Sequence, residues 1–216
     1  MQKSNHAKYL EQIAGNRGLG RLLKRIGAVD SETGRMGIRK KCIYLWRYSM
    51  FFEVERTPEM KITLLTVGKT DRDWVRQGLD IYVSRLRHYI PFSIVEIPEL
   101  KNVSALSKDQ IKTREGELIL KNIRPTDDVI LMDDRGREYT SVELAKVIQE
   151  KISYTGKDMV FIIGGAYGFS PEVYARANSK ISLSKMTFSH QMVRAIFAEQ
   201  LYRAFTIMRG EPYHHE

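Results

Sequence analysis

Five short, mostly apolar runs alternate with longer segments of helical periodicity between Met60 and the C-terminus. Runs of this kind, several of them ended by Gly or Pro, are typical of strands buried on both faces of a sheet. Strands that alternate with helices usually pair in parallel, and the helices cover both faces. The sequence therefore predicts an α/β domain with a mainly parallel sheet flanked by helices, its strands covering residues 61–67, 92–97, 128–133, 158–163 and 179–184.

Helix start signals support the same pattern. Ser107 with Gln110, and Thr140 with Glu143, are capping-box pairs, and the Ser-Pro pair at residues 170–171 sets an N-cap and a first helical residue. An Arg-Gly-Arg sequence at residues 135–137 indicates a turn after the third strand. Apolar residues at helical spacing predict helices over residues 73–89, 107–123, 140–152 and 191–208, with a short helix from residue 171.

Residues 1–59 differ in composition and pattern from residues 60–216, which are predicted to form the domain. The chain carries a net charge of +9, and this first segment holds 12 of the 35 Lys and Arg but only 6 of the 26 Asp and Glu. Six glycines interrupt any helical pattern there. One interpretation is a poorly ordered extension, such as upstream sequence read in frame before a start at Met60; the other is an RNA-binding arm built on the basic residues 35–41.

Composition excludes several classes of protein. The single cysteine, Cys42, permits neither an internal disulfide nor a thiolate metal cluster, which indicates a reducing compartment. The sequence has neither 18 consecutive apolar residues nor an N-terminal signal pattern, so we expect a cytoplasmic protein without a membrane partner. No His-Glu-x-x-His spacing occurs, and His190, His214 and His215 have no cysteine companion, so no metal is expected.

A glycine-rich loop, Gly164-Gly165-Ala166-Tyr167-Gly168, follows the fourth predicted strand. It matches neither the dinucleotide fingerprint nor the phosphate-binding P-loop, and no nucleophile elbow occurs in the chain. Paired glycines let the backbone approach a ligand closely, which suits a neutral base such as adenine. The same glycines could simply form a tight turn from strand to helix. Ligands of parallel sheets bind beyond the carboxyl ends of the strands, so the loops after residues 133, 163 and 184 are the candidate site.

Several spaced motifs of residues 60–216 resemble one family. They are Met60-Lys-Ile-Thr-Leu-Leu-Thr-Val-Gly68, Ile162-Ile-Gly-Gly-Ala-Tyr-Gly-Phe-Ser170, Ile181-Ser-Leu-Ser-Lys-Met-Thr-Phe-Ser-His190, residues 194–203 and Pro212-Tyr213-His214. In this order they resemble the RlmH family, the large-subunit rRNA pseudouridine N3-methyltransferases of the SPOUT superfamily. The resemblance implies an α/β knot with a C-terminal trefoil and a homodimer. It also implies S-adenosylmethionine as methyl donor and, as target, a pseudouridine in helix 69 of 23S rRNA on the assembled 70S ribosome. Threaded chains are very rare, so the knot is implied by the resemblance alone.

The resemblance also implies a cofactor pocket at the three candidate loops. The implied residues are Met132, Gly165, Ser184, Lys185, Met186, Thr187, Phe188 and Ser189. Without it, core packing is the simpler interpretation of Met132. The chain departs from the family at its end, where His215 stands in place of the usual Arg. A neutral imidazole binds phosphate more weakly than a guanidinium does, so RNA affinity or its pH dependence is expected to differ.

Methylation of a ring nitrogen requires in-line approach, removal of the N3 proton and stabilisation of charge on the flanking carbonyls. The candidates for the base are His190, Glu199, Tyr213 and His214, while Arg194 and Arg203 could bind phosphate or an enolate-like oxygen. Each has a structural alternative. Glu199 and Arg203, four residues apart, could be a surface ion pair, and His190 could cap or pack the last helix.

The tail residues favour a shared site, in which the tail of one subunit completes the site of the other. Three alternatives remain: a knotted tRNA methyltransferase, a ribosome-binding protein without catalysis, and a nucleotide-binding α/β protein that lacks the usual phosphate motifs. Residues 60–216 carry 23 Lys and Arg against 20 Asp and Glu, an excess too small for RNA binding by bulk charge. Recognition is therefore expected to depend on a few placed groups.

Overall fold

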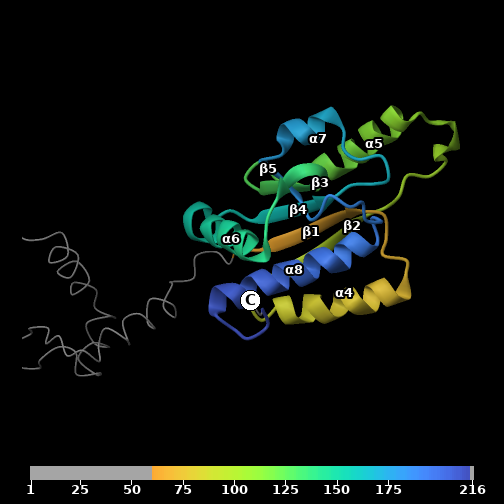
Figure 1. Cartoon of the computed structure of the whole chain (residues 1–216). Coiled ribbons are helices and arrows are strands. Elements are labelled where there is room, and N and C mark those ends of the chain that lie inside the picture. The colour runs from red at the N-terminus through yellow and green to blue at the C-terminus, as the bar shows by residue number, and fades with distance from the viewer. Residues whose placement is uncertain (1–59, 215–216) are drawn as a thin grey trace, which may run out of the picture. The chain divides into compact units, whose positions relative to one another are not determined.

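A computed structural model describes residues 60–214, so the predictions for residues 1–59 and for His215 lie outside the described residues. The core is a five-stranded sheet in the order β2-β1-β4-β3-β5, with every neighbouring pair of strands parallel (Figure 1). The predicted parallel α/β fold is confirmed. The strands are β1 (Ile62–Val67), β2 (Phe92–Ile97), β3 (Asp128–Glu138), β4 (Met159–Ile163) and β5 (Ser179–Ser182).

Helices cover both faces of the sheet (Figure 1). One face carries α4 (Asp73–Leu86), α6 (Ser141–Thr155) and α8 (Met192–Arg209), and α8 packs side by side with both of the others. The opposite face carries α5 (Lys108–Lys121) and α7 (Pro171–Arg176), and a single 3-10 turn, η1 (Val103–Ala105), precedes α5. No helix in the described part of the chain is long and apolar enough to cross a membrane.

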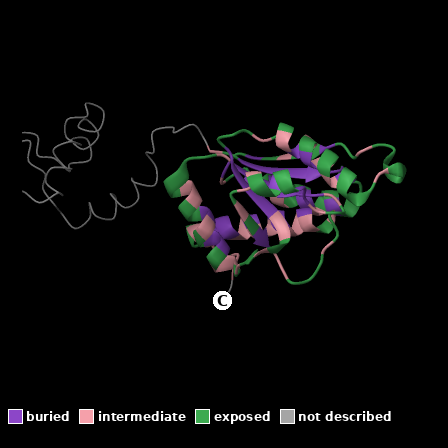
Figure 2. Cartoon of the chain, turned by 90° about the horizontal axis from the view of Figure 1, so that it is seen from above, coloured by how far each residue is buried: buried purple, intermediate pink, exposed green. Residues whose placement is uncertain are grey.

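The two central strands β1 and β4 are buried throughout, as their mostly apolar composition predicts. In β1, Ile62 and Leu64 belong to the core under α4, α6 and α8, whereas Leu65 and Val67 belong to the core under α5 and α7. This alternation is the two-residue period of a strand. Figure 2 shows the buried sheet between helices that are exposed on their outer sides.

The predicted helix starts are confirmed in their hydrogen bonds. The Ser107 hydroxyl accepts from the Gln110 amide, while the Gln110 side chain accepts from the Ser107 amide at 2.8 Å. Thr140 and Glu143 form the same reciprocal pair at the start of α6. Such pairs satisfy two backbone donors that the first helical turn leaves without partners, which fixes where the helix begins.

The prediction for residues 133–137 is wrong in one respect: β3 does not end in a turn but continues to Glu138. Ile181 of β5 pairs with Met132 and again with Arg137, so the register of β3 shifts between these two residues. Gly136 lies in this shifted part of β3, against β5. An added Cβ there would come within 2.6 Å of the Ile181 and Ser182 amide nitrogens. Residue 136 is therefore a glycine because backbone occupies the space of a side chain. The trefoil knot itself stays a prediction.

Candidate active site

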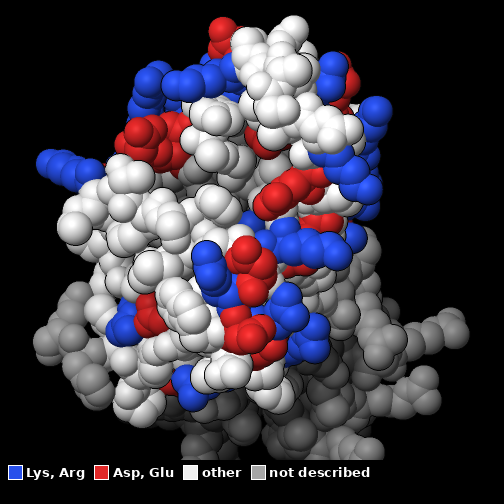
Figure 3. Space-filling model, turned by 90° about the vertical axis from the view of Figure 1, so that its right-hand side faces the viewer, with Lys and Arg blue, Asp and Glu red and all other residues white. Residues whose placement is uncertain are grey.

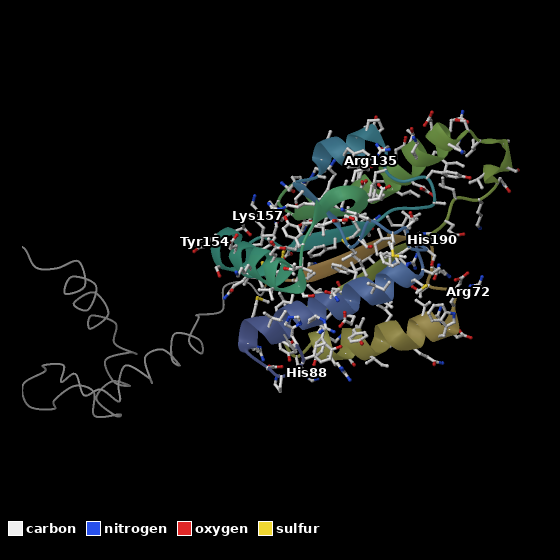
Figure 4. All side chains as sticks on the ribbon, in the orientation of Figure 1. Arg72, His88, Arg135, Tyr154, Lys157 and His190 are labelled. Atoms are coloured by element: carbon white, nitrogen blue, oxygen red, sulfur yellow. The ribbon has the colours of Figure 1, made fainter. Side chains whose placement is uncertain are left out.

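A cavity of about 650 Å³ opens beyond the carboxyl ends of β4 and β5 and beside the middle of β3. Its walls come from residues 132–135 of β3, from the loops that follow β4 and β5 and from the start of α8, with one side chain each from α5 and α7. Parallel strands place their carboxyl ends at one edge of the sheet, which explains why segments far apart in sequence meet there. His190 lies at this end of the domain, where α4 and α8 begin, and Tyr154 lies at the opposite end (Figure 4).

The glycine loop after β4 is held close to α5. The Gly168 amide donates to the Gly165 carbonyl at 3.2 Å, and Gly168 has a φ of +80°, a conformation that favours glycine. A Cβ on Gly165 would lie 2.5 Å from a carboxylate oxygen of Glu115. Burial, and then the charge of Glu99, raise the pKa of Glu115. The loop thus presents backbone where a side chain would not fit without displacing Glu115.

The loop after β5 is shaped by short polar side chains that bond to nearby backbone. The Ser182 hydroxyl donates to the Ser184 carbonyl at 2.9 Å, and the Ser184 hydroxyl accepts from the Met186 amide at 3.0 Å. Ser189 accepts from the Met192 amide at 3.2 Å, at the beginning of α8. Local bonds of this type give an irregular segment one defined path.

Most of the predicted cofactor residues line this cavity. Lys185 is exposed and does not line it. His190, from the predicted catalytic set, lines it as well. Their roles as ligands stay predictions. The lining residues from the predicted cofactor set are Met132, Gly165, Ser184, Met186, Thr187, Phe188 and Ser189.

The lining residues that were not foreseen from the sequence include a hydrogen-bonded pair, Asp133 and Tyr174. The Tyr174 hydroxyl donates to the Asp133 carboxylate, which also accepts from the Arg135 amide at 2.8 Å. Burial and the bond to Asp133 raise the pKa of Tyr174 to about 12. An acidic residue at the end of a buried strand was the available signal, but its partner is 41 residues away in sequence.

Arg194 does not fit the predicted contact with phosphate or a substrate oxygen. Its side chain is fully buried, and its nitrogens donate to the His190 carbonyl, the Thr70 hydroxyl and the Val67 carbonyl at 2.8–2.9 Å. Glu96 lies 3.7 Å away. Burial lowers the pKa of Arg194, and Glu96 opposes that effect. We therefore assign Arg194 a positioning role, joining the start of α8 to the end of β1.

The other predicted catalytic residues form a separate group, the tail cluster, defined as Glu199, Arg203, Tyr213, His214 and Tyr82. Glu199 accepts from the Arg203 Nε at 3.0 Å and from the Tyr213 hydroxyl at 3.2 Å. Arg203 also lies 3.5 Å from His214 Nδ1, with its guanidinium 4.7 Å from the Tyr213 ring centroid. The Tyr82 and Tyr213 hydroxyls are 3.5 Å apart. The pKa of Tyr213 is raised, first by burial of the phenol and then by its neighbours Tyr82 and Glu199.

Aromatic contacts fix the tail against the helices of its own subunit. Tyr213 meets Tyr202 edge to face, with ring centroids 4.8 Å apart, and the Tyr89 hydroxyl donates to Glu211. No residue of the tail cluster lines the cavity. The predicted catalytic residues are thus divided: His190 lies at the cavity, and Glu199, Tyr213 and His214 lie farther along α8 and its tail.

Comparisons with known proteins agree with this architecture. A family model described as "Predicted SPOUT methyltransferase" matches residues 60–214. Ribosomal RNA large subunit methyltransferase H of Parabacteroides distasonis is 52% identical over 157 residues, which are 73% of this chain and 100% of the relative. The protein of the same name from Phocaeicola vulgatus is 55% identical over the same shares.

Among solved structures, the chain is similar to a putative RNA methyltransferase of the TrmH family from Porphyromonas gingivalis. It is 13% identical and has a TM-score of 0.33, covering 68% of this chain and 62% of that one; this likeness supports no inference. The family model and the relatives confirm the resemblance stated from the motifs. The chain belongs to the SPOUT methyltransferases, and among them to the family of ribosomal RNA large subunit methyltransferase H.

Proposed function

We propose that this protein transfers a methyl group from S-adenosylmethionine to N3 of a pseudouridine in helix 69 of 23S rRNA, on the assembled 70S ribosome in the cytoplasm. The observation that carries the proposal is a cavity beside β3 and beyond the ends of β4 and β5, lined by seven of the eight predicted cofactor residues, in a chain of this family. The relatives, named as large-subunit rRNA methyltransferases, support rRNA as the substrate class.

The cavity fits the cofactor in size and in chemistry. Its volume lies within the range of small-molecule sites, and its walls combine apolar side chains with accessible backbone. The close approach of Gly165 to Glu115 leaves main-chain groups at the wall. We assign the adenosine to the backbone of Gly165 and of residues 184–189, with Met132 as an apolar contact. When bound, the cofactor supplies a methyl group on a positively charged sulfur.

The protein must orient the base and handle its N3 proton. His190 lines the cavity and is exposed, so it can reach a substrate there. Tyr213 has a raised pKa and remains protonated at neutral pH, which suits it to donate a hydrogen bond to a carbonyl oxygen of the base. Glu199 and His214 lie beside Tyr213 and remain candidates for the base.

The separation of cavity and tail cluster supports a homodimeric site. Within one subunit, no residue of the tail cluster lines the cavity. In a two-fold dimer the same patch of both subunits forms the interface. If that patch contains the cavity and the tail, the tail of one copy can complete the cavity of the other. The proposed site therefore takes its cofactor loops from one subunit and its tail from the next.

Label transfer from radioactive S-adenosylmethionine tests the reaction. We expect transfer to 70S ribosomes and little to free 23S rRNA or tRNA, and equal transfer by a chain that begins at Met60. Transfer to tRNA in preference would favour the knotted tRNA methyltransferase. Calorimetry separates the second alternative, because a ribosome-binding protein without catalysis would bind 70S ribosomes but not S-adenosylmethionine.

Mixed dimers test the shared site. Tyr213→Ala removes a tail, and Gly165→Val fills the cofactor wall against Glu115, so each variant alone is expected to be inactive. Random mixing puts one intact site on each heterodimer and restores about one quarter of the wild-type activity. A site made within one subunit would give no recovery. Tyr154→Ala, at an 85% exposed residue of α6, is the matched control and keeps full activity.

A further inference from the structure

Tyr167 is an exposed aromatic residue at the rim of the cavity. It lies in the glycine loop after β4, lines the cavity, and leaves 46% of its surface open to solvent. A tyrosine needed only for the turn would have no reason to hold its ring at the mouth of a cofactor site. Its phenol forms no hydrogen bond with the rest of residues 60–214, so the ring is available for a ligand.

A second exposed apolar side chain lines the same cavity. Met186 lies in the loop after β5 and is 73% exposed. The two side chains come from the two loops to which the cofactor is assigned. An adaptable thioether and a flat ring, both at the opening, give a planar ligand two apolar surfaces to touch.

Positive charges accompany this apolar rim. The Lys108 ammonium, on the first turn of α5, lies 5.8 Å from the Tyr167 ring centroid. Lys112 and Arg135 line the cavity, although Lys112 also pairs with Asp109 at 2.6 Å. Figure 4 shows Arg135 on the side of the sheet that carries α7. Figure 3, which faces the end of the domain where α4 and α8 begin, shows positive and negative groups interspersed, so attraction there is local and not a broad basic field.

An aromatic ring next to an ammonium group matches the chemistry of a nucleotide in single-stranded form. The base stacks on the ring, and the phosphate meets the cation. A base that enters an enzyme cavity must leave its own stack, which costs a few kcal/mol. A ring at the entrance offsets part of that cost.

We infer that Tyr167 is the stacking platform for the unstacked pyrimidine of the RNA substrate, with Lys108 beside it for the adjoining phosphate. This inference rests on the proposed function and deepens it by naming a substrate-binding residue. Tyr167 contacts the base and leaves cofactor binding to the backbone around it. Its loss is therefore expected to weaken RNA binding and to spare S-adenosylmethionine affinity.

Two assays on the full-length protein test the inference. Replacing Tyr167 by Ala removes the ring and is expected to weaken binding to 70S ribosomes about tenfold, with a matching rise in KM, because stacking on one aromatic contributes about 1–3 kcal/mol. Tyr167→Phe keeps the ring and retains near wild-type affinity. Calorimetry with S-adenosylmethionine and light scattering are expected to show unchanged cofactor affinity and an unchanged dimer. Tyr154→Ala is again the matched control.

The outcomes separate this inference from the proposed function. Unchanged ribosome affinity in Tyr167→Ala would overturn the inference, as would a parallel loss of cofactor affinity or of the dimer. A wild-type protein that binds 70S ribosomes through Tyr167 but transfers no methyl group would overturn the proposed function alone. Normal methylation by the wild type and by Tyr167→Ala would overturn the inference alone.

Discussion

The cavity and the tail cluster are built by different means. The cavity lies between the middle of β3 and the loops after β4 and β5, where glycines, short serines and backbone hydrogen bonds set the shape. The tail cluster is a set of interlocked side chains on α4, α8 and the tail, held by an ion pair and by edge-to-face tyrosines. Cofactor binding and substrate chemistry therefore require different kinds of local structure. A neutral nucleoside can be bound by backbone, whereas proton handling needs particular side chains held on rigid elements.

The two regions should therefore respond to different kinds of mutation. At the cavity and at the neighbouring contact between β3 and β5, added volume is the damaging change, because Glu115 or backbone already fills the space of a side chain. At the tail cluster, loss of a polar or aromatic partner is the damaging change. Three substitutions at and beside the cavity test these two kinds of change, in order of decreasing expected effect.

Gly136→Ala should produce the largest effect, and it acts through volume alone. The new methyl group would collide with the Ile181 and Ser182 backbone, which cannot rotate away as a side chain can. We expect the free energy of unfolding to fall by about 3 kcal/mol or more. Urea unfolding gives this value, and cofactor affinity should fall with it.

Gly78→Ala is the matched control, since Gly78 lies in α4 and no atom lies within 4 Å of its added Cβ. Alanine there should stabilise the protein by about 0.5–1 kcal/mol, because glycine is a poor helix former. If both substitutions change the free energy of unfolding by the same amount, crowding against β5 does not explain why residue 136 is a glycine.

Arg194→Met tests the residue that lies between the two regions. Methionine keeps much of the volume but leaves the Val67 and His190 carbonyls without these donors and Glu96 without its cation. We expect a loss of about 2–4 kcal/mol in unfolding free energy. Arg209→Met, at an exposed residue of the same helix stacked on Tyr89, should cost no more than about 1 kcal/mol. Unchanged stability with weaker ribosome binding would instead restore Arg194 as an RNA contact.

Tyr174→Phe tests the hydrogen bond between Tyr174 and Asp133 at the cavity, through pH. Because the pKa of Tyr174 rises from 10.0 to about 12 on folding, the folded state holds its proton more tightly. Its stabilising contribution is complete below pH 10 and is lost as pH rises from 10 to 12. Tyr89 and Tyr213, whose pKa values are also raised, act with the same sign near the tail. The difference between wild-type and Tyr174→Phe unfolding curves isolates Tyr174; an identical slope in both proteins would refute the assignment.

Local sequence signals predicted nearly all of the described fold. The capping boxes at Ser107 and Thr140 give the helix starts because both partners lie within one turn. The uninterrupted apolar strands indicated burial on both faces. The continuation of β3 past Asp133 could not be predicted in this way, since it depends on pairing with Ile181, far along the chain.

The site was predictable to a different degree in its two regions. Parallel strands place their carboxyl ends at one edge of the sheet, so the position of the loops after β4 and β5 at the cavity followed from strand order alone, although residues 132–135 line it from within β3. The division of the catalytic candidates did not, because Arg194 and Glu199 lie on one continuous helix and look equivalent in sequence. Their roles depend on which elements pack against each turn of α8, and the sequence does not specify those neighbours.

The double pairing of Ile181 imposes an order on synthesis. Met132 and Arg137 leave the ribosome about 50 residues before the strand that pairs with both of them. At roughly 5–20 residues per second, the end of β3 waits some seconds for β5 to exist. The last wall of the cavity therefore forms only after β5 has been made. A methyl donor present during translation would therefore meet a complete site only when the chain is almost finished.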